Sequence, residues 1–166
     1  LFRSRSLGLL GACLVVGLAG WLWVFGLGVA AFGLGSVATS APLLGVVAAA
    51  VGSYTLVAVS IGFLMGQIGL GQHAANAVAN IGGMALSFLG GAWVPIECLP
   101  DSLARAARLT PGYWADRAIS GAYEATSMSA AVIGPLLVEC GICALFAVAV
   151  FSVAVAVGRA RARSAL

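Results

Sequence analysis

The segment LLGVVAAAVGSYTLVAVSIGFLMG, residues 43–66, contains no Asp, Glu, Lys or Arg, and neither does any other part of residues 6–96. His73 is the one side chain in that stretch that becomes charged readily. A soluble domain keeps ionic groups on its surface, whereas each charge at the centre of a bilayer costs about 2.5–3.5 kcal/mol. The sequence therefore predicts an integral membrane protein.

Composition and charge placement agree with this prediction. Hydrophobic residues make up 62% of the chain, and glycine, which lets membrane helices approach closely, occurs 23 times. Every basic residue is an arginine, and these lie in the two tails and in residues 95–125, which also contain four acids. This distribution is typical of membrane orientation and gives no phosphate-binding face, so we expect no nucleic-acid partner.

Two polar interruptions divide the uncharged stretch into spans of about 20 residues or more. One is the small, polar segment 35–42, and the other is the polar cluster between Gln67 and Asn80. The sequence thus predicts an all-α, polytopic membrane helix bundle, a single transmembrane domain over 1–166 with four transmembrane spans, near 7–34, 43–66, 74–94 and 129–158.

Four spans place both tails on one side of the membrane. Neither tail contains an acid, and together they hold five arginines: Arg3, Arg5, Arg159, Arg161 and Arg163. By the positive-inside rule, both termini are expected to be cytoplasmic in the cell (inner) membrane, with residues 95–125 outside.

Residues 95–125 contain the signals for two short amphipathic helices. Pro100 suits the first turn of one helix, and Thr110-Pro111 ends it and begins the next. Trp93 and Trp114 flank the pair, and aromatic rings favour the membrane interface. We expect an external re-entrant or amphipathic helical hairpin; the alternative is a folded loop that rests on the membrane surface.

The order of three motifs resembles the C-terminal signature of ABC-2 type transporter permeases. That signature is a glycine-rich span ending in proline, an LP-x-x-L helix, and a P-x-x-W/Y segment before the last span. The resemblance covers about residues 45–158 and depends on six residues of the predicted hairpin: Pro95, Leu99, Pro100, Leu103, Pro111 and Trp114.

The resemblance implies a membrane-spanning permease subunit of an ATP-driven exporter, which moves a small molecule, peptide or lipid outward. It also implies an ABC ATP-binding subunit and a second permease copy, as homo- or heterodimer, as partners in the lipid bilayer. Permeases of the family usually have six spans, so we expect residues 1–166 to be spans three to six of a longer permease. The alternative is a non-transporting four-span accessory or assembly protein.

The chain shows no motif of an enzyme. It lacks the GxxxxGK[ST] phosphate loop, HExxH and GxSxG, so we expect no catalytic residue, cofactor or metal on this chain and ATP bound by a partner subunit. Cys140 and Cys143 have CxxC spacing but no second ligand pair nearby, and we expect them to pack as small apolar side chains.

Two groups of polar residues are candidates for function. Glu139 lies inside the last apolar run, where an ionisable group is a functional hypothesis by default, and with Ser87 and Asn80 it forms a candidate substrate path. The alternative is a hydrated carboxyl near the outer interface. A candidate ATPase-facing turn, which could equally be an ordinary solvated turn, consists of Gln67, Gln72, His73 and Asn76.

Overall fold

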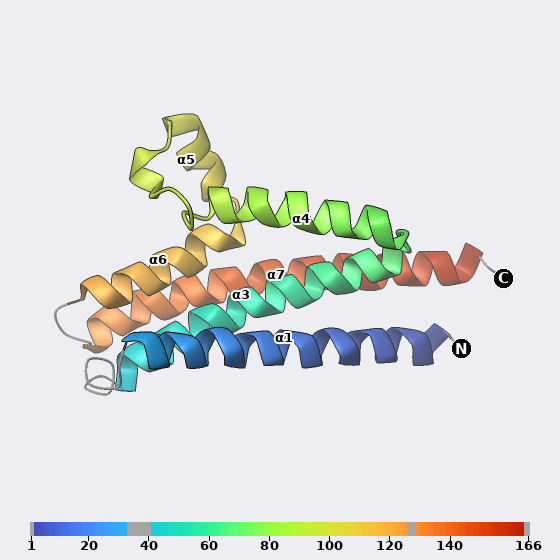
Figure 1. Cartoon of the computed structure of the whole chain (residues 1–166), viewed down its shortest axis with the longest axis horizontal. Helices are drawn as coiled ribbons and strands as arrows, with labels where there is room; N and C mark the ends of the chain where they lie inside the picture. Colours follow the sequence, from blue (N-terminus) through green and yellow to red (C-terminus); the bar gives the residue numbers. More distant parts are fainter. Residues whose placement is uncertain (1, 33–40, 126–128, 165–166) are drawn as a thin grey trace.

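The computed structural model describes residues 2–32, 41–125 and 129–164, and it is built from helices (Figure 1). No strand occurs within those three ranges, which confirms the predicted all-α class. In chain order the elements are α1 (Phe2–Phe32), α3 (Ala41–Ile68), α4 (Gln72–Leu89), η1 (Ile96–Cys98), α5 (Asp101–Ala107), α6 (Pro111–Glu124) and α7 (Ala130–Ser164).

Three helices of the described chain are long and apolar enough to cross a membrane. They comprise Leu7–Gly28 of α1, Ala41–Ile68 of α3 and Ala130–Arg163 of α7. A bilayer core needs about 20 apolar residues of helix, so these three helices indicate a membrane protein. The predicted third span, 74–94, is different, because α4 has only 18 residues and begins with several polar ones.

The element boundaries correct the sequence prediction at several points. Most of the predicted 35–42 loop lies outside the described residues, but Pro42 belongs to the first turn of α3, a position that suits proline. The predicted third span stops early, because α4 ends at Leu89 and Gly91 adopts a left-handed φ of 91°. The last helix continues beyond the predicted residue 158, to Ser164.

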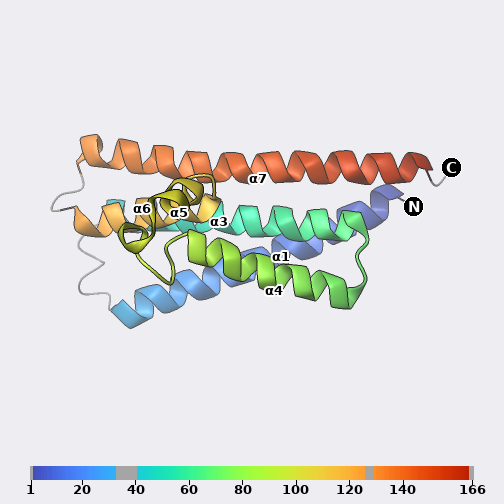
Figure 2. The same ribbon diagram turned by 90° about the horizontal axis from the view of Figure 1, so that it is seen from above.

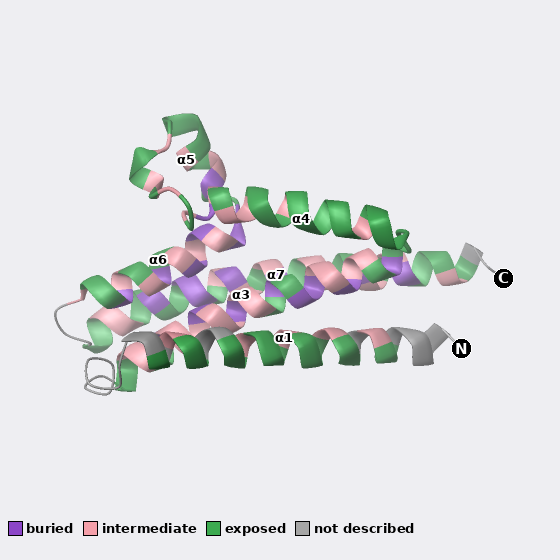
Figure 3. Ribbon diagram, viewed as in Figure 1, coloured by how far each residue is buried: buried purple, intermediate pink, exposed green. Residues whose placement is uncertain are grey.

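The core of the bundle lies where α3, α6 and α7 meet. Ala115, Ala118 and Ala122 of α6 recur at helical spacing and are each at most 6% exposed. Ala118 packs with Ala50 of α3 and Cys140 of α7, and the other two alanines make equivalent three-helix clusters. The second predicted amphipathic helix therefore packs along the long helices by a face that contains these small residues, and Figure 3 shows buried segments of α6, α3 and α7 where the three helices meet.

Both described ends of the chain, in α1 and α7, lie at the same end of the bundle (Figures 1 and 2). The turn from α3 to α4 lies at that end too. There Arg161 of α7 donates hydrogen bonds to the carbonyls of Gln67 and Ile68, the last two residues of α3. A cation at a helix C-terminus satisfies free carbonyls and complements the helix dipole.

α4 and α6 follow one another along the length of the bundle and run in the same direction, while η1 and α5 form an excursion between them (Figures 1 and 2). Where they meet, their backbones approach closely. A Cβ added at Gly112 would lie 3.0 Å from the Cα of Gly90, and one added at Gly90 would lie 3.1 Å from the Cα of Gly112. Only glycine fits this junction without a shift of the backbone.

Candidate functional site

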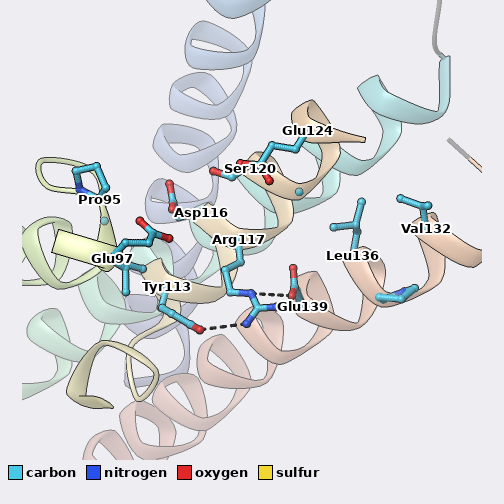
Figure 4. A pocket seen from close by; sticks show the side chains of 14 residues that line it. Pro95, Glu97, Tyr113, Asp116, Arg117, Ser120, Glu124, Val132, Leu136 and Glu139 are labelled. Atoms are coloured by element: carbon cyan, nitrogen blue, oxygen red, sulfur yellow. Dashed lines mark hydrogen bonds and ion pairs between the residues drawn. The ribbon is translucent and has the colours of Figure 1, made fainter. Parts of the chain in front are cut away.

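A cleft of about 750 Å³ lies between the loop at η1, helix α6 and the first half of α7 (Figure 4). Its size is within the range of small-molecule sites in proteins. Ionisable groups from all three elements line it, namely Glu97, Asp116, Arg117, Glu124 and Glu139.

The centre of the cleft is an ion pair between α6 and α7. Nε of Arg117 donates to Oε1 of Glu139 at 3.0 Å. Nη1 of the same guanidinium donates to the hydroxyl of Tyr113 at 3.1 Å. The two partners differ in exposure, because the Arg117 side chain is 53% exposed and that of Glu139 only 12%.

The second oxygen of Glu139, Oε2, is buried and has no hydrogen-bond partner among the described residues. Most buried polar atoms in proteins are paired, and an unpaired one costs about 1–3 kcal/mol, more when charged. Arg117 thus compensates Glu139 through one oxygen only, although an arginine can bind both oxygens of a carboxylate.

The other carboxyl groups of the cleft are less buried than Glu139. Glu97 and Glu124 are exposed, and Asp116 is partly buried. The charge balance of the cleft is therefore acidic, with Arg117 as the one basic group among its described lining residues.

The predicted substrate-path residues do not come together. Glu139 is in α7 and pairs with Arg117, whereas Ser87 and Asn80 are in α4, which contacts α5 and α6. Sequence reasoning missed Arg117 as the partner of Glu139 because it expected residues 95–125 to form a hairpin on the outer side of the membrane. The available signal was electrostatic: a carboxyl within an apolar run needs a cation nearby.

Ser87 and Asn80 instead belong to a polar stripe on α4. His73, Asn76, Asn80 and Ser87 are spaced by three, four and seven residues, which places them on one face of the helix. The first three are exposed, Ser87 is half-buried, and no residue of α4 is buried. We call these four residues the polar stripe.

A different face of α4 looks toward α3. Between the two helices lies a cleft of about 460 Å³ with apolar walls, to which α4 contributes Val78, Gly82 and Leu86. The side of α4 that faces α3 is thus apolar, and the polar stripe lies on an adjoining face, where its first three residues are exposed.

The predicted ATPase-facing residues divide into two environments. Gln67 is in the last turn of α3, at 9% exposure, and so is not part of the turn. Gln72, His73 and Asn76 begin α4 and are exposed. The turn itself is residues 69–71, where Gly69 has a left-handed φ of 66° that ends α3.

The six residues behind the family resemblance mark the ends of the short helices or pack near them. Pro95, Leu99 and Pro100 flank η1 and α5, and Leu103 lies in α5 at 39% exposure. Pro111 is buried in the first turn of α6. Nε1 of Trp114 donates to the carbonyl of Arg108 at 2.9 Å, which links α6 back to the end of α5.

The cysteines of the CxxC spacing are buried in the three-helix core. Cys140 and Cys143 are 6% and 0% exposed, and they pack against alanines of α6. This placement agrees with the expected packing role.

Comparisons of the chain with protein-family models, with curated proteins and with solved structures gave no match.

Proposed function

We propose that this chain is the membrane-spanning part of a permease, an ATP-driven exporter subunit of the ABC-2 type that moves a small molecule, peptide or lipid outward. The observation that carries the proposal is the polar stripe on α4, beside three apolar helices of membrane length. The imidazole of His73 and the amides of Asn76 and Asn80 would lose their hydrogen bonds to water if they faced lipid, which costs free energy. Within a bilayer this face of α4 therefore needs water or another protein surface beside it. A permease path supplies both.

In this proposal the membrane is crossed four times. α1, α3 and α7 make three crossings, and the fourth consists of α4 and α6 in sequence, broken at Gly90 and Gly112. Broken helices occur within membranes where protein or a water-filled cavity covers the free backbone groups. Both termini lie in the cytoplasm of a cell with an inner membrane, and η1 and α5, which leave the fourth crossing at its break, are reached by water from the outer side.

The proposed partners are an ABC ATP-binding subunit and a second permease copy, whose polar stripe faces that of the first across the path. The ATP-binding subunit contacts the turn 69–71 and the start of α4, and it supplies the nucleotide chemistry for which this chain has no motif. The chain itself is then a transport subunit without catalytic residues.

The first test is purification of the tagged native protein from solubilised membranes, with its partners identified by mass spectrometry. We expect an ATPase that contains GxxxxGK[ST], and a second permease copy carrying a different tag. Recovery without any ATPase would contradict the exporter proposal and favour a four-span accessory protein.

The second test addresses the polar stripe. In a Cys98→Ser background, Asn80→Cys should form a disulfide between two copies in native membranes, since Asn80 is at the middle of the stripe. Val153→Cys, on an exposed part of α7, is the matched control and should not crosslink. Equal crosslinking at both positions would show that the copies collide at random, and it would contradict the proposal that their polar stripes face each other.

Sidedness is tested by labelling whole cells with a membrane-impermeant maleimide. Ser102→Cys in α5 should react from outside, and Gly71→Cys should react only after the membrane is opened; both positions are exposed. The reverse pattern would refute the proposed topology.

A further inference from the structure

The cleft of about 460 Å³ between α3 and α4 is an elongated apolar groove, which we call the α3–α4 groove. Its lining residues extend from Tyr54 to Ile68 on α3 and from Val78 to Leu86 on α4, and Leu70 lines it at the turn between the two helices. At about 1.5 Å per residue, the α3 wall is about 21 Å long. One leaflet of a bilayer core is about 15 Å deep, so the groove is long enough for an extended acyl chain.

The groove is open because α4 is attached to the bundle elsewhere. α4 contacts the rest of the described chain mainly through α5 and α6, and none of its own residues is buried. Val78 lines the groove and is nevertheless 53% exposed. A Cβ added at Gly82 or Gly83, in the same wall, would meet nothing within 4 Å. Apolar walls that stand apart in this way call for an apolar occupant.

One end of the groove is basic. The guanidinium of Arg161, at the end of α7, donates hydrogen bonds to the carbonyls of Gln67 and Ile68. Because Ile68 also lines the groove, this guanidinium lies against the end of its α3 wall. Carbonyl groups are neutral, so these two bonds do not cancel the positive charge.

The surroundings of Arg161 reinforce that charge. Arg159 and Arg163 are exposed on the same part of α7, and α3, α4 and the turn between them contain no acid. The single acid of α7, Glu139, lies about 33 Å from Arg161 along the helix, at about 1.5 Å per residue. A groove with apolar walls and a cationic end is complementary to an amphiphile with an apolar chain and an anionic head.

We propose that the α3–α4 groove binds an anionic phospholipid, with an acyl chain between the two helices and the phosphate at Arg161. Arginine binds phosphate by charge-assisted hydrogen bonds, and basic pockets between membrane helices bind anionic head groups. A zwitterionic lipid fits the same walls but brings an ammonium group to the basic end. The proposal goes beyond the proposed function, because it requires a membrane and does not depend on export.

The test is native mass spectrometry of the purified protein in a nonionic detergent. The probes are dioleoylphosphatidylglycerol, which is anionic, and dioleoylphosphatidylcholine, which has the same chains and no net charge. The first bound lipid should show at least about tenfold higher affinity when it is the anionic one. Glycerol 3-phosphate, a soluble phosphate without chains, should not displace it. Equal affinity for the two lipids, or displacement by glycerol 3-phosphate, would overturn the proposal.

One pair of variants locates the head group. Arg161→Gln should weaken binding of the anionic lipid by about tenfold and leave that of the zwitterionic lipid nearly unchanged. Arg105→Gln removes the same charge from α5, outside the groove, and should change neither affinity. Equal losses in the two variants would show attraction by net charge alone and would overturn the proposal.

A second pair locates the acyl chain. Gly82→Leu places a side chain in the open groove and should weaken both lipids by about fivefold or more. Gly141→Leu is the matched control, because this exposed position of α7 lies outside the groove and also has space for a Cβ. This pair tests the site even if Arg161→Gln folds poorly, and equal effects of the two leucines would overturn the proposal.

A second copy of the chain is the other possible occupant of the groove. In a Cys98→Ser background, a disulfide between two Val78→Cys copies in native membranes would show that occupant and reject the lipid. A recovered ATPase with no preference for the anionic lipid would leave the exporter proposal intact and reject this one alone. Lipid binding without an ATPase would do the reverse.

Discussion

Gly112→Ala is expected to destabilise the protein, because it introduces a methyl group where α6 meets α4. The added Cβ would lie 3.0 Å from the Cα of Gly90 and 3.3 Å from the carbonyl oxygen of Leu86. Optimal carbon contacts are about 3.5–4.0 Å, so the two backbones must separate by about 0.5–1 Å. Both neighbouring atoms belong to the backbone, so no side chain can move aside.

Overpacking of this kind costs about 1–3 kcal/mol, while the helix propensity gained by Gly→Ala is at most about 1 kcal/mol. The net expectation is a loss of about 1–2 kcal/mol in the free energy of unfolding. Gly141→Ala in α7 is the matched control, because a Cβ there meets nothing within 4 Å, and it should be neutral or slightly stabilising.

The assay is equilibrium unfolding of each purified variant in mixed micelles with increasing SDS, followed by tryptophan fluorescence. Gly90→Ala and the double variant complete the experiment. Because both single substitutions widen the same contact, the double variant should lose less than the sum of the two single losses. Stability of Gly112→Ala equal to that of Gly141→Ala, or strict additivity of the pair, would refute this account of the junction.

Two further outcomes can be measured in the same assay. Arg161→Gln should lose about 1–2 kcal/mol, because the last carbonyls of α3 lose their charged donor; unchanged stability would show that water replaces it. Ala118→Leu should lose about 1–3 kcal/mol by overpacking the three-helix core, whereas Ser120→Leu on the exposed side of α6 should have little effect; equal effects would mean that α6 is not packed as described.

The class of fold could be predicted from the sequence. An uncharged, apolar stretch of more than about 20 residues is long enough to cross a bilayer as a helix, and few other structures satisfy its backbone hydrogen bonds there. The two short helices could be predicted as well, since Pro100 directly precedes α5 and Pro111 is the first residue of α6. These signals are local, and local signals determine where helices begin and end.

The packing of α6 and the partner of Glu139 could not be predicted in this way. The charges at 97–124 suggested a segment outside the bundle, but the buried side of α6 consists of alanines spaced one turn apart, which leave little trace in average hydropathy. The end of α4 depends on the approach of Gly90 to Gly112, two residues far apart in sequence. The distance between Arg117 and Glu139 likewise follows from tertiary packing rather than spacing.

The contact between Gly90 and Gly112 also has a practical use. Because the chain leaves the bundle and returns to it at nearly the same point, η1 and α5 form a closed loop with a narrow base. A small rigid protein grafted into α5 would be carried on that loop while the packed helices keep their connection. Such a graft would give this protein a visible marker for particle alignment in electron cryo-microscopy.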